Sequence, residues 1–206
     1  MNWNIPNILT LLRLIAAPGV AIMFLYFHRP LADWFALILF VVAAFTDFLD
    51  GYLARAWKQE SKFGAMMDPI ADKAMVIIAL VVITGFSGMN PWILLPAVLI
   101  IFREVFVSGL REFLGETAGL LKVTNLAKWK TTVQMAAISV LFAKGAFEEY
   151  LIDRTNGDEL GLRTLELGAE ISWYLGIGLL WIAMVLTVLS GADYFRKSLP
   201  YLRDAT

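Results

Sequence analysis

The chain alternates between long apolar runs and short polar connections. Six runs approach or exceed the roughly 20 residues that a helix needs to cross the hydrocarbon core of a bilayer, at residues 7–27, 31–54, 69–86, 91–114, 127–146 and 171–195. The second and fourth runs are longer than the bilayer requires, and such helices tilt or protrude from it. The pattern predicts an all-α, polytopic membrane protein with six transmembrane helices, forming a single domain over residues 1–206.

Three connections between the runs are longer than the others, at residues 55–68, 115–126 and 147–170. The third connection is acidic, and its Thr-Asn-Gly-Asp-Glu-Leu-Gly segment at residues 155–161 indicates a turn. We expect the stretch after this turn, residues 162–171, to form either a surface helix or the start of the sixth span.

Composition supports the membrane interpretation. Hydrophobic residues make up 59% of the chain, and only 17% of the residues are charged. Soluble domains are less apolar than this and carry more charge. A net charge of −1 gives no support for a nucleic-acid partner. The absence of cysteine excludes disulfides and thiolate metal sites. Arg13, the first basic residue, lies inside the first run, so we expect this run to be a span and not a cleavable signal.

The distribution of Lys and Arg predicts the orientation. Six spans place both termini on one side, and that side collects all 17 basic residues except Arg29, Lys144, Arg154 and Arg163. Because basic residues concentrate on the cytoplasmic side of membrane proteins, we expect cytoplasmic termini in a bacterial inner membrane and an acidic 147–170 connection outside.

Two pairs of aspartates border the connection between the second and third runs. Asp47 and Asp50 are three residues apart, Asp68 and Asp72 are four apart, and each pair shares one helical face. We expect the second and third spans to pack antiparallel, so that both pairs converge at the cytoplasmic edge. Acids at a membrane are costly unless a cation offsets them. Four carboxylates supply enough oxygens for two hard cations, Mg²⁺ or Mn²⁺, which suits phosphoryl-type transfer.

Small and basic residues accompany the aspartates. Gly51 gives up about 1 kcal/mol of helix propensity relative to alanine, which close approach of a ligand or a helix would offset. Arg55 lies four residues later on the same face and suits a phosphate. Ala54 lies on the same helix, and Gly64 is expected in the turn between the spans. Helix packing, a turn and a positive-inside anchor are the simpler explanations of these residues.

The spacing Asp47-x2-Asp50-Gly51-x2-Ala54-Arg55-x8-Gly64-x3-Asp68-x3-Asp72 resembles the signature of the CDP-alcohol phosphotransferases at every defined position. The segments NIPNILTLLR, REVFVSGLREF and AKWKTTVQM are similar to members of this family that use sn-glycerol 3-phosphate. The likeness covers roughly residues 3–145. It implies a six-span fold and transfer of a phosphatidyl group from CDP-diacylglycerol to the 1-hydroxyl of sn-glycerol 3-phosphate, with release of CMP.

The resemblance also implies residue roles. Asp47, Asp50 and Asp68 are expected to bind the metals, and Asp72, close to the metals, to act as general base. The residues alone do not separate a base from a ligand, so Asp72 is counted with both groups. Thr10, Gly51, Ala54, Arg55 and Gly64 are expected to bind the donor. Family likeness further implies a homodimer in contact with membrane lipid.

An acceptor that is a phosphate dianion needs cations of its own. Candidates near the cytoplasmic ends of the fourth and fifth runs are Arg103, Arg111, Lys128 and Lys130. Arg13, in the first run, is a further candidate for either the acceptor phosphate or the nucleotide side of the donor. Each of these residues could also be an interfacial anchor whose charged end extends to water.

Three alternatives remain open from the sequence. The acceptor could be another alcohol, such as serine or inositol phosphate, and serine would not need a cationic pocket. A divalent-cation transporter would carry acids nearer mid-membrane on broken helices. A catalytically inactive lipid-binding scaffold would bind lipid without forming product.

Overall fold

The structure, a computed structural model, describes residues 5–56, 61–120, 125–153 and 159–202. Within these residues it confirms the all-α prediction. The elements, in chain order, are α1 (Ile5–Tyr26), α2 (Leu31–Ala56), α3 (Lys62–Phe86), α4 (Pro91–Leu114), the short 3₁₀ helix η1 (Gly115–Leu120), α5 (Asn125–Asp153) and α6 (Glu159–Leu202).

Four of the described helices are long and apolar enough to cross a membrane: α1, α3, α4 and α6. In α2 the described apolar stretch, Leu31–Thr46, is shorter. The chain is therefore a multi-pass membrane protein. Helix α5 is less apolar, and it packs against α6, α2 and α3. A helix enclosed by neighbours can carry polar side chains that a lipid-facing helix cannot.

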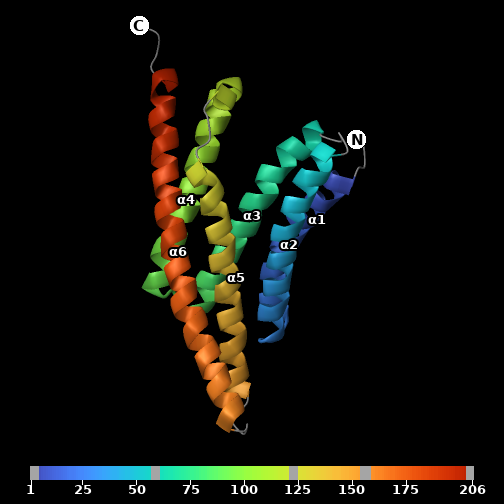
Figure 1. Ribbon diagram of the computed structural model, residues 1–206, viewed down its shortest axis with the longest axis vertical. Helices are drawn as coiled ribbons and strands as arrows, with labels where there is room; N and C mark the ends of the chain where they lie inside the picture. Colours follow the sequence, from blue (N-terminus) through green and yellow to red (C-terminus); the bar gives the residue numbers. More distant parts are fainter. Residues whose placement is uncertain (1–4, 57–60, 121–124, 154–158, 203–206) are drawn as a thin grey trace.

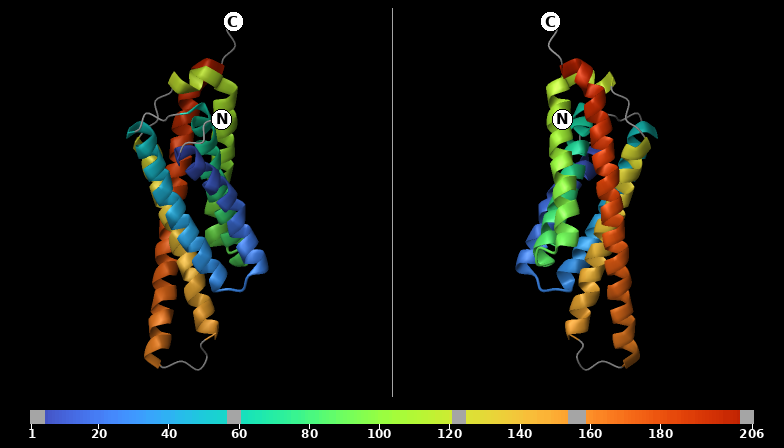
Figure 2. Two further views of the ribbon diagram at one scale, coloured as in Figure 1. Left: turned by 90° about the vertical axis from the view of Figure 1, so that its right-hand side faces the viewer. Right: turned by 90° about the vertical axis from the view of Figure 1, so that its left-hand side faces the viewer.

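The six long helices run roughly along one axis of the molecule (Figures 1 and 2). The start of α1 and the end of α6 lie toward the same end of the bundle, which we call the terminal end. The starts of α3 and α5 and the ends of α2 and α4 also lie there. At the opposite end, α5 and α6 extend past the other helices as a pair (Figure 2).

Helix α1 lies between α2 and α3. It packs against both of them, whereas α2 and α3 make little direct contact along the described residues. Helices α2 and α3 run antiparallel, as expected (Figure 1). The expected direct packing of the second span on the third is wrong for this part of the chain, where each of the two helices packs against α1 instead.

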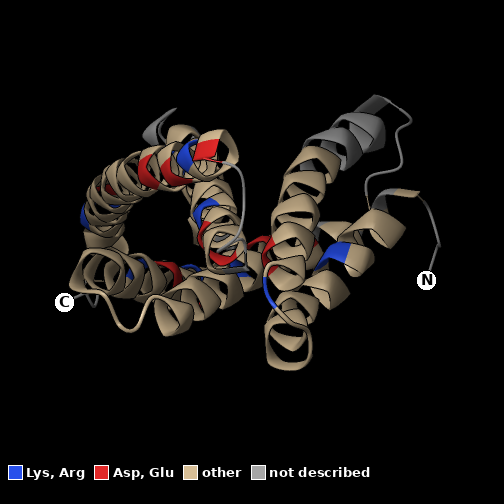
Figure 3. Cartoon of the chain, turned by 90° about the horizontal axis from the view of Figure 1, so that it is seen from below, with Lys and Arg blue, Asp and Glu red and all other residues tan. Residues whose placement is uncertain are grey.

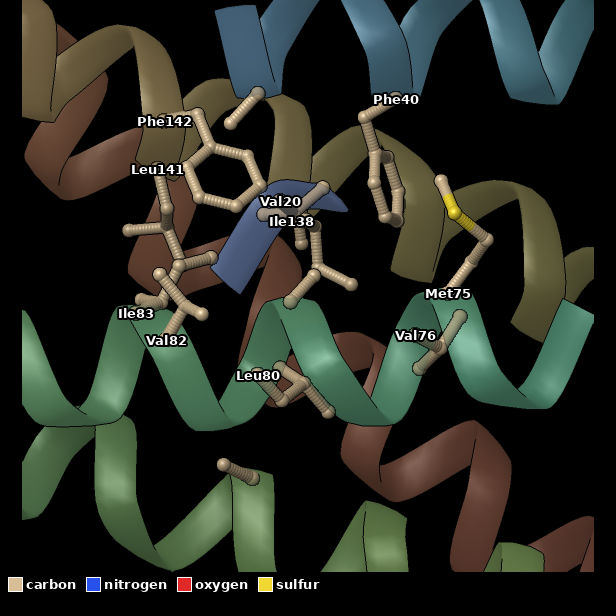
Figure 4. Packing of buried hydrophobic residues seen from close by; sticks show 14 of the residues in the cluster. Val20, Phe40, Met75, Val76, Leu80, Val82, Ile83, Ile138, Leu141 and Phe142 are labelled. Atoms are coloured by element: carbon tan, nitrogen blue, oxygen red, sulfur yellow. The ribbon is translucent and has the colours of Figure 1, made fainter. Parts of the chain in front are cut away.

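A large apolar cluster holds the helices together (Figure 4), and a smaller one joins α4 and α6. Phe40 of α2, Leu80 of α3, and Ile138 and Phe142 of α5 are all fully buried or nearly so. Figure 4 shows these side chains converging from different helices. Association inside a bilayer depends on such close packing, because lipid tails are as apolar as the side chains.

Helix α3 begins earlier than the hydropathy predicts. Ser61 is its N-cap, and its hydroxyl accepts a hydrogen bond from the backbone N–H of Gly64 at 3.0 Å. Serine is among the preferred N-cap residues because it satisfies an amide that the helix leaves unpaired. Gly64 therefore lies in the first turn of α3, and its expected place in the turn between two spans is wrong.

The acidic connection at residues 147–170 is mostly helical. Helix α5 continues to Asp153, and α6 begins at Glu159, so only residues 154–158 between them fall outside the description. Of the two possibilities left open for the stretch after the turn, the structure shows the start of the last helix. This helix is 44 residues long and has no break.

At the end opposite the termini, Arg29 joins two helices. Its guanidinium donates to both carboxylate oxygens of buried Asp33 on α2, at 2.6 and 2.9 Å, and pairs with Glu149 on α5 at 3.0 Å. Burial lowers the pKa of Arg29, but the hydrogen bond and charge of Asp33 outweigh this effect and raise it. Figure 3, a view from this end, shows the acidic and basic positions of the ribbon among a majority of other residues.

Gly145 of α5 lies directly against this charge cluster. A Cβ built there would overlap Oδ1 of Asp33 and would lie 2.5 Å from an Arg29 nitrogen. We predict that Gly145→Ala lowers the free energy of unfolding by about 1–3 kcal/mol, the usual cost of overpacking. Separation of the buried pair would add to this cost. Thermal unfolding of the purified protein in detergent measures the change.

The matched control is Gly178→Ala on α6, where a Cβ would meet nothing within 4 Å. The control should unfold at the same temperature as the original protein or slightly higher, because alanine has the better helix propensity. Equal unfolding temperatures for the two variants would contradict the close packing at Gly145.

Candidate active site

Helix α1 presents a buried polar stripe near the terminal end. Asn7, Thr10 and Arg13 recur every three residues and are 4%, 1% and 4% exposed. The same face continues with buried Ala17 and Val20. A spacing of three or four residues keeps side chains on one side of a helix, so the stripe changes from polar to apolar on entering the core.

The polar stripe binds the aspartates of α3. The Thr10 hydroxyl donates to Oδ1 of Asp68 at 2.6 Å, and the Arg13 guanidinium donates to Oδ1 of Asp72 at 3.1 Å. A second nitrogen of Arg13 lies 3.7 Å from Asp68. Hydrogen bonds to charged groups stabilise by about 1.5–3 kcal/mol. The two carboxylates, one helical turn apart, are thus held by one neighbouring helix.

Gly64 lets α1 approach this part of α3. A Cβ there would lie 3.0 Å from Oδ1 of Asn7 and 3.3 Å from the hydroxyl of Ser61. The same hydroxyl donates to Oδ1 of Asn7 at 2.7 Å. The glycine of the sequence signature therefore serves close packing of two helices beside Asp68.

A cavity of about 250 Å³ opens next to Asp72, between α3, α4, α5 and α6. This is smaller than the roughly 300–1,000 Å³ of pockets for drug-sized ligands, and it suits a small polar molecule. Its polar and charged lining residues are Asp72, Lys73, Arg103, Glu104, Arg111, Lys130, Thr131, Gln134, Ser190, Asp193 and Tyr194.

Glu104 connects two of the cations. Its Oε1 accepts hydrogen bonds from Arg103, at 3.0 Å, and from the ammonium of Lys130 on α5. Arg103 also donates to the hydroxyl of Ser190 on α6 at 3.1 Å. A Cβ at Gly191 would lie 2.8 Å from Cγ of Arg103, so only glycine gives this side chain its room.

Arg111 and Lys73 are held differently. The Arg111 guanidinium lies 5.6 Å from the centre of the Tyr194 ring, which is a cation–π arrangement. Lys73 follows Asp72 directly and also lines the cavity. Neither cation forms an ion pair with any residue that the structure describes.

The structure brings together many of the predicted site residues. Thr10 and Arg13 contact Asp68 or Asp72, while Arg103, Arg111 and Lys130 line the cavity beside Asp72. Arg13 is not part of the cavity lining, because its guanidinium is directed to the aspartates. Side chains that lie outside the described residues are Asp47, Asp50, Gly51, Ala54, Arg55 and Lys128, although the backbone of each is helical.

A protein-family model described as CDP-alcohol phosphatidyltransferase matches residues 3–189. The chain belongs to this family. It is 63% identical to the CDP-diacylglycerol–glycerol-3-phosphate 3-phosphatidyltransferase of Cereibacter sphaeroides, over 99% of each chain. Proteins with the same name from Rickettsia bellii and Haemophilus influenzae are 39% and 37% identical, over 98–99% of this chain and 98% of each relative.

Members of the family use a divalent metal, and the described residues fit part of such a site. Asp68 and Asp72 offer hard carboxylate oxygens on one face of α3, and their side chains are 44% and 36% exposed. No group of three or more Asp, Glu, His or Cys that could hold a metal occurs among the described side chains. Asp47 and Asp50 at the end of α2, whose side chains lie outside the described residues, are the candidates for further ligands.

Sequence reasoning missed three residues of the site. Asn7 had no assigned role, but it lies inside α1 and its side-chain oxygen accepts a hydrogen bond from the Ser61 hydroxyl. Lys73 was counted only for orientation, and Glu104 had no assigned role, yet both line the cavity. The sequence holds two weak signals for these residues. Lys73 directly follows Asp72, and Glu104 lies seven residues before Arg111, which places both on one helical face.

We predict that Arg13→Lys lowers the turnover number about tenfold or more without preventing folding. A lysine ammonium is a single point charge and does not reproduce the planar fork that reaches both aspartates. Release of CMP by the purified variant measures the effect, with thermal unfolding as the check on folding.

The control for this experiment is Arg196→Lys, the same change at an exposed position of α6. It should keep the original turnover. If Arg13→Lys is as active as this control, the bonds from α1 do not position the aspartates for catalysis.

Proposed function

We propose that this chain transfers the phosphatidyl group of CDP-diacylglycerol to the 1-hydroxyl of sn-glycerol 3-phosphate, forming phosphatidylglycerophosphate and CMP. It is then a transferase of phospholipid biosynthesis. The observation that carries the proposal is the 63% identity, over the whole chain, to a relative named for this reaction. The complete signature and the basic cavity beside Asp72 support it independently.

The reaction moves a phosphorus centre between two oxygens. The acceptor's 1-hydroxyl oxygen forms a new bond to the phosphorus that bears the diacylglycerol. The bond from that phosphorus to the CMP oxygen breaks, and the electron pair leaves with CMP. The hydroxyl proton must go to a base within hydrogen-bond reach.

We assign that base to Asp72. Of the two signature aspartates whose side chains the structure describes, Asp72 is the one that lines the basic cavity. It also accepts a hydrogen bond from Arg13 of α1. An acceptor in the cavity would place its hydroxyl next to this carboxylate. Asp68 is assigned to the metal, because its Oδ1 is held by Thr10 and Oδ2 receives no hydrogen bond from the described residues.

Asp47 and Asp50 at the end of α2 would complete the metal site with Asp68 and, at its margin, Asp72. When bound, divalent ions neutralise the diphosphate of the donor and stabilise the leaving phosphate. We expect two ions and Mg²⁺ in cells, with Mn²⁺ as the alternative. Gly51, Ala54 and Arg55 are proposed to lie against the donor. Thr10 and Gly64 were expected there too, but both are buried where α1 meets α3, so they are proposed to position Asp68.

The acceptor phosphate is proposed to bind in the cavity. Arg103, Arg111 and Lys130 were expected there, and Lys73 joins them in the lining. Lys128, whose side chain lies outside the described residues, stays a candidate. A serine acceptor would not need this positive charge. The alternatives of a cation transporter and an inactive scaffold are given up, because the family and the full-length relatives are transferases.

We further propose that all six long helices cross the bilayer and that the terminal end faces the cytoplasm of a bacterial inner membrane. The donor's acyl chains would remain in the bilayer while its headgroup meets the water-soluble acceptor. The chain is also expected to form a homodimer, which cross-linking and mass measurement in detergent would test.

Replacement of Asp72 by asparagine should reduce turnover by about 10²–10⁴-fold, the usual contribution of a general base. Asparagine keeps the shape but loses the basic oxygen. The assay follows CMP released from CDP-diacylglycerol with sn-glycerol 3-phosphate. Glu170→Gln, a similar loss of charge at an exposed site on α6, is the control and should retain activity. An active Asp72→Asn enzyme would refute the assignment of the base.

Chelation of divalent cations by EDTA should abolish product formation, and excess Mg²⁺ should restore it, because carboxylates alone cannot offset the charge of a diphosphate. Product formation that continues at full rate in EDTA would contradict the proposed metal site.

A panel of acceptors decides the substrate. With sn-glycerol 3-phosphate, serine and inositol phosphate offered separately, only the first should give labelled lipid product at a substantial rate. Preference for either of the others would leave the family assignment intact and change the acceptor.

A further inference from the structure

The cavity contains a carboxylate that a binding site for a phosphate dianion does not need. Glu104 is 7% exposed and lies among the cations that would attract the acceptor. A negative charge at this place opposes phosphate binding. Glu104 holds Arg103 and Lys130, and both cations donate to the same oxygen, Oε1. This role does not account for the second carboxylate oxygen.

The other oxygen, Oε2, accepts no hydrogen bond from the described residues. It is also not among the buried polar side-chain atoms that lack a partner, so it is not closed off by the protein. Glu104 lines the cavity, and Oε2 is the carboxylate oxygen that Arg103 and Lys130 leave available to a ligand there. An ionised carboxylate oxygen can only accept hydrogen bonds. A ligand at this oxygen must therefore offer a donor.

The cations divide into two groups around Glu104. Arg103 and Lys130 are already bound to its carboxylate, whereas Arg111 and Lys73 have no ion pair within the described part of the chain. The second group is therefore the better match for the phosphate. The 1-hydroxyl belongs near Asp72, where the proton must go.

One polar group of the proposed acceptor is then left without a partner, the hydroxyl on its second carbon. We propose that Glu104 accepts a hydrogen bond from this hydroxyl and so selects an acceptor that carries it. This inference rests on the proposed function, since it assigns a partner to one group of sn-glycerol 3-phosphate. Glu104 would be a specificity-determining residue, and it would also hold Arg103 and Lys130 in place through Oε1.

The physical basis is the cost of an unmatched acceptor. A site that hydrogen-bonds a substrate hydroxyl discriminates against the analogue without it, because a desolvated polar group is left unpaired. Hydrogen bonds to a charged partner are the stronger class. Since this cavity is partly open to water, we expect a discrimination of about tenfold to a hundredfold, below that of a sealed site.

The test compares two acceptors, sn-glycerol 3-phosphate and 3-hydroxypropyl phosphate. The second compound keeps the phosphate and the primary hydroxyl but lacks the hydroxyl between them. The quantity measured is the ratio of kcat/KM for the two acceptors, from CMP release. The original protein should prefer sn-glycerol 3-phosphate by about tenfold or more. A ratio near one would overturn the proposal.

Glu104→Gln removes the charge and keeps the size of the side chain, and Glu104→Met keeps the length without a strong acceptor. In both variants the ratio should fall several-fold toward one. A loss of activity that is equal for the two acceptors would mean that Glu104 acts only by holding the cations, and would also overturn the proposal. The glutamine variant decides the question if the methionine variant does not fold.

The matched control is Ser190→Ala, which removes the other partner of Arg103 without touching Glu104. This variant should lower kcat/KM for both acceptors by the same factor and leave their ratio unchanged. The experiment separates failure of the proposed function from failure of this inference. If the proposed function is wrong, the original protein forms no product from sn-glycerol 3-phosphate. If product forms but Glu104→Gln leaves the ratio of kcat/KM for the two acceptors unchanged, only the role of Glu104 is rejected.

Discussion

The structure depends on one constraint, that a charged side chain inside an apolar bundle must have a partner. Three clusters of ionised groups satisfy it: Arg13 with two aspartates, Glu104 with two cations, and Arg29 with two acids. Each cluster joins side chains from different helices or connections. Because an unpaired buried charge costs several kcal/mol, these clusters fix which helix faces meet. The first two clusters lie in the candidate site and the third lies at the opposite end.

The site has two parts that meet at Asp72. One part, between α1 and α3, fixes carboxylates with short hydrogen bonds, and it suits a metal and a diphosphate. The other part, between α3, α4, α5 and α6, is a small cavity with basic walls, and it suits a charged acceptor. Asp72 belongs to both parts. A carboxylate in this position can take a proton from the acceptor while the donor is held beside it.

The sequence was sufficient for the helical class, for most helix positions and for the family, because hydropathy and an eight-residue signature depend on local order along the chain. It was less informative about helix ends, since the cap by Ser61 depends on a single polar group. The helical conformation of residues 162–171, at the start of α6, was only one of two possibilities. The place of α1 between α2 and α3, and the role of Glu104, required the tertiary contacts. Nothing in the spacing of Glu104 shows that one of its oxygens is occupied and the other open.

Helix α6 is 44 residues long. At a rise of about 1.5 Å per residue it extends for about 66 Å, roughly twice the hydrocarbon thickness of a bilayer. A crossing of the hydrocarbon therefore accounts for only part of its length, and at the end opposite the termini it extends past the other helices with the end of α5 beside it (Figure 2). Small membrane proteins rarely offer an ordered region outside the detergent micelle. This helix pair offers antibody fragments an ordered epitope at the end of the bundle opposite the candidate active site. A complex with such a fragment would be large enough to align in electron micrographs, and it would leave the active site free for turnover.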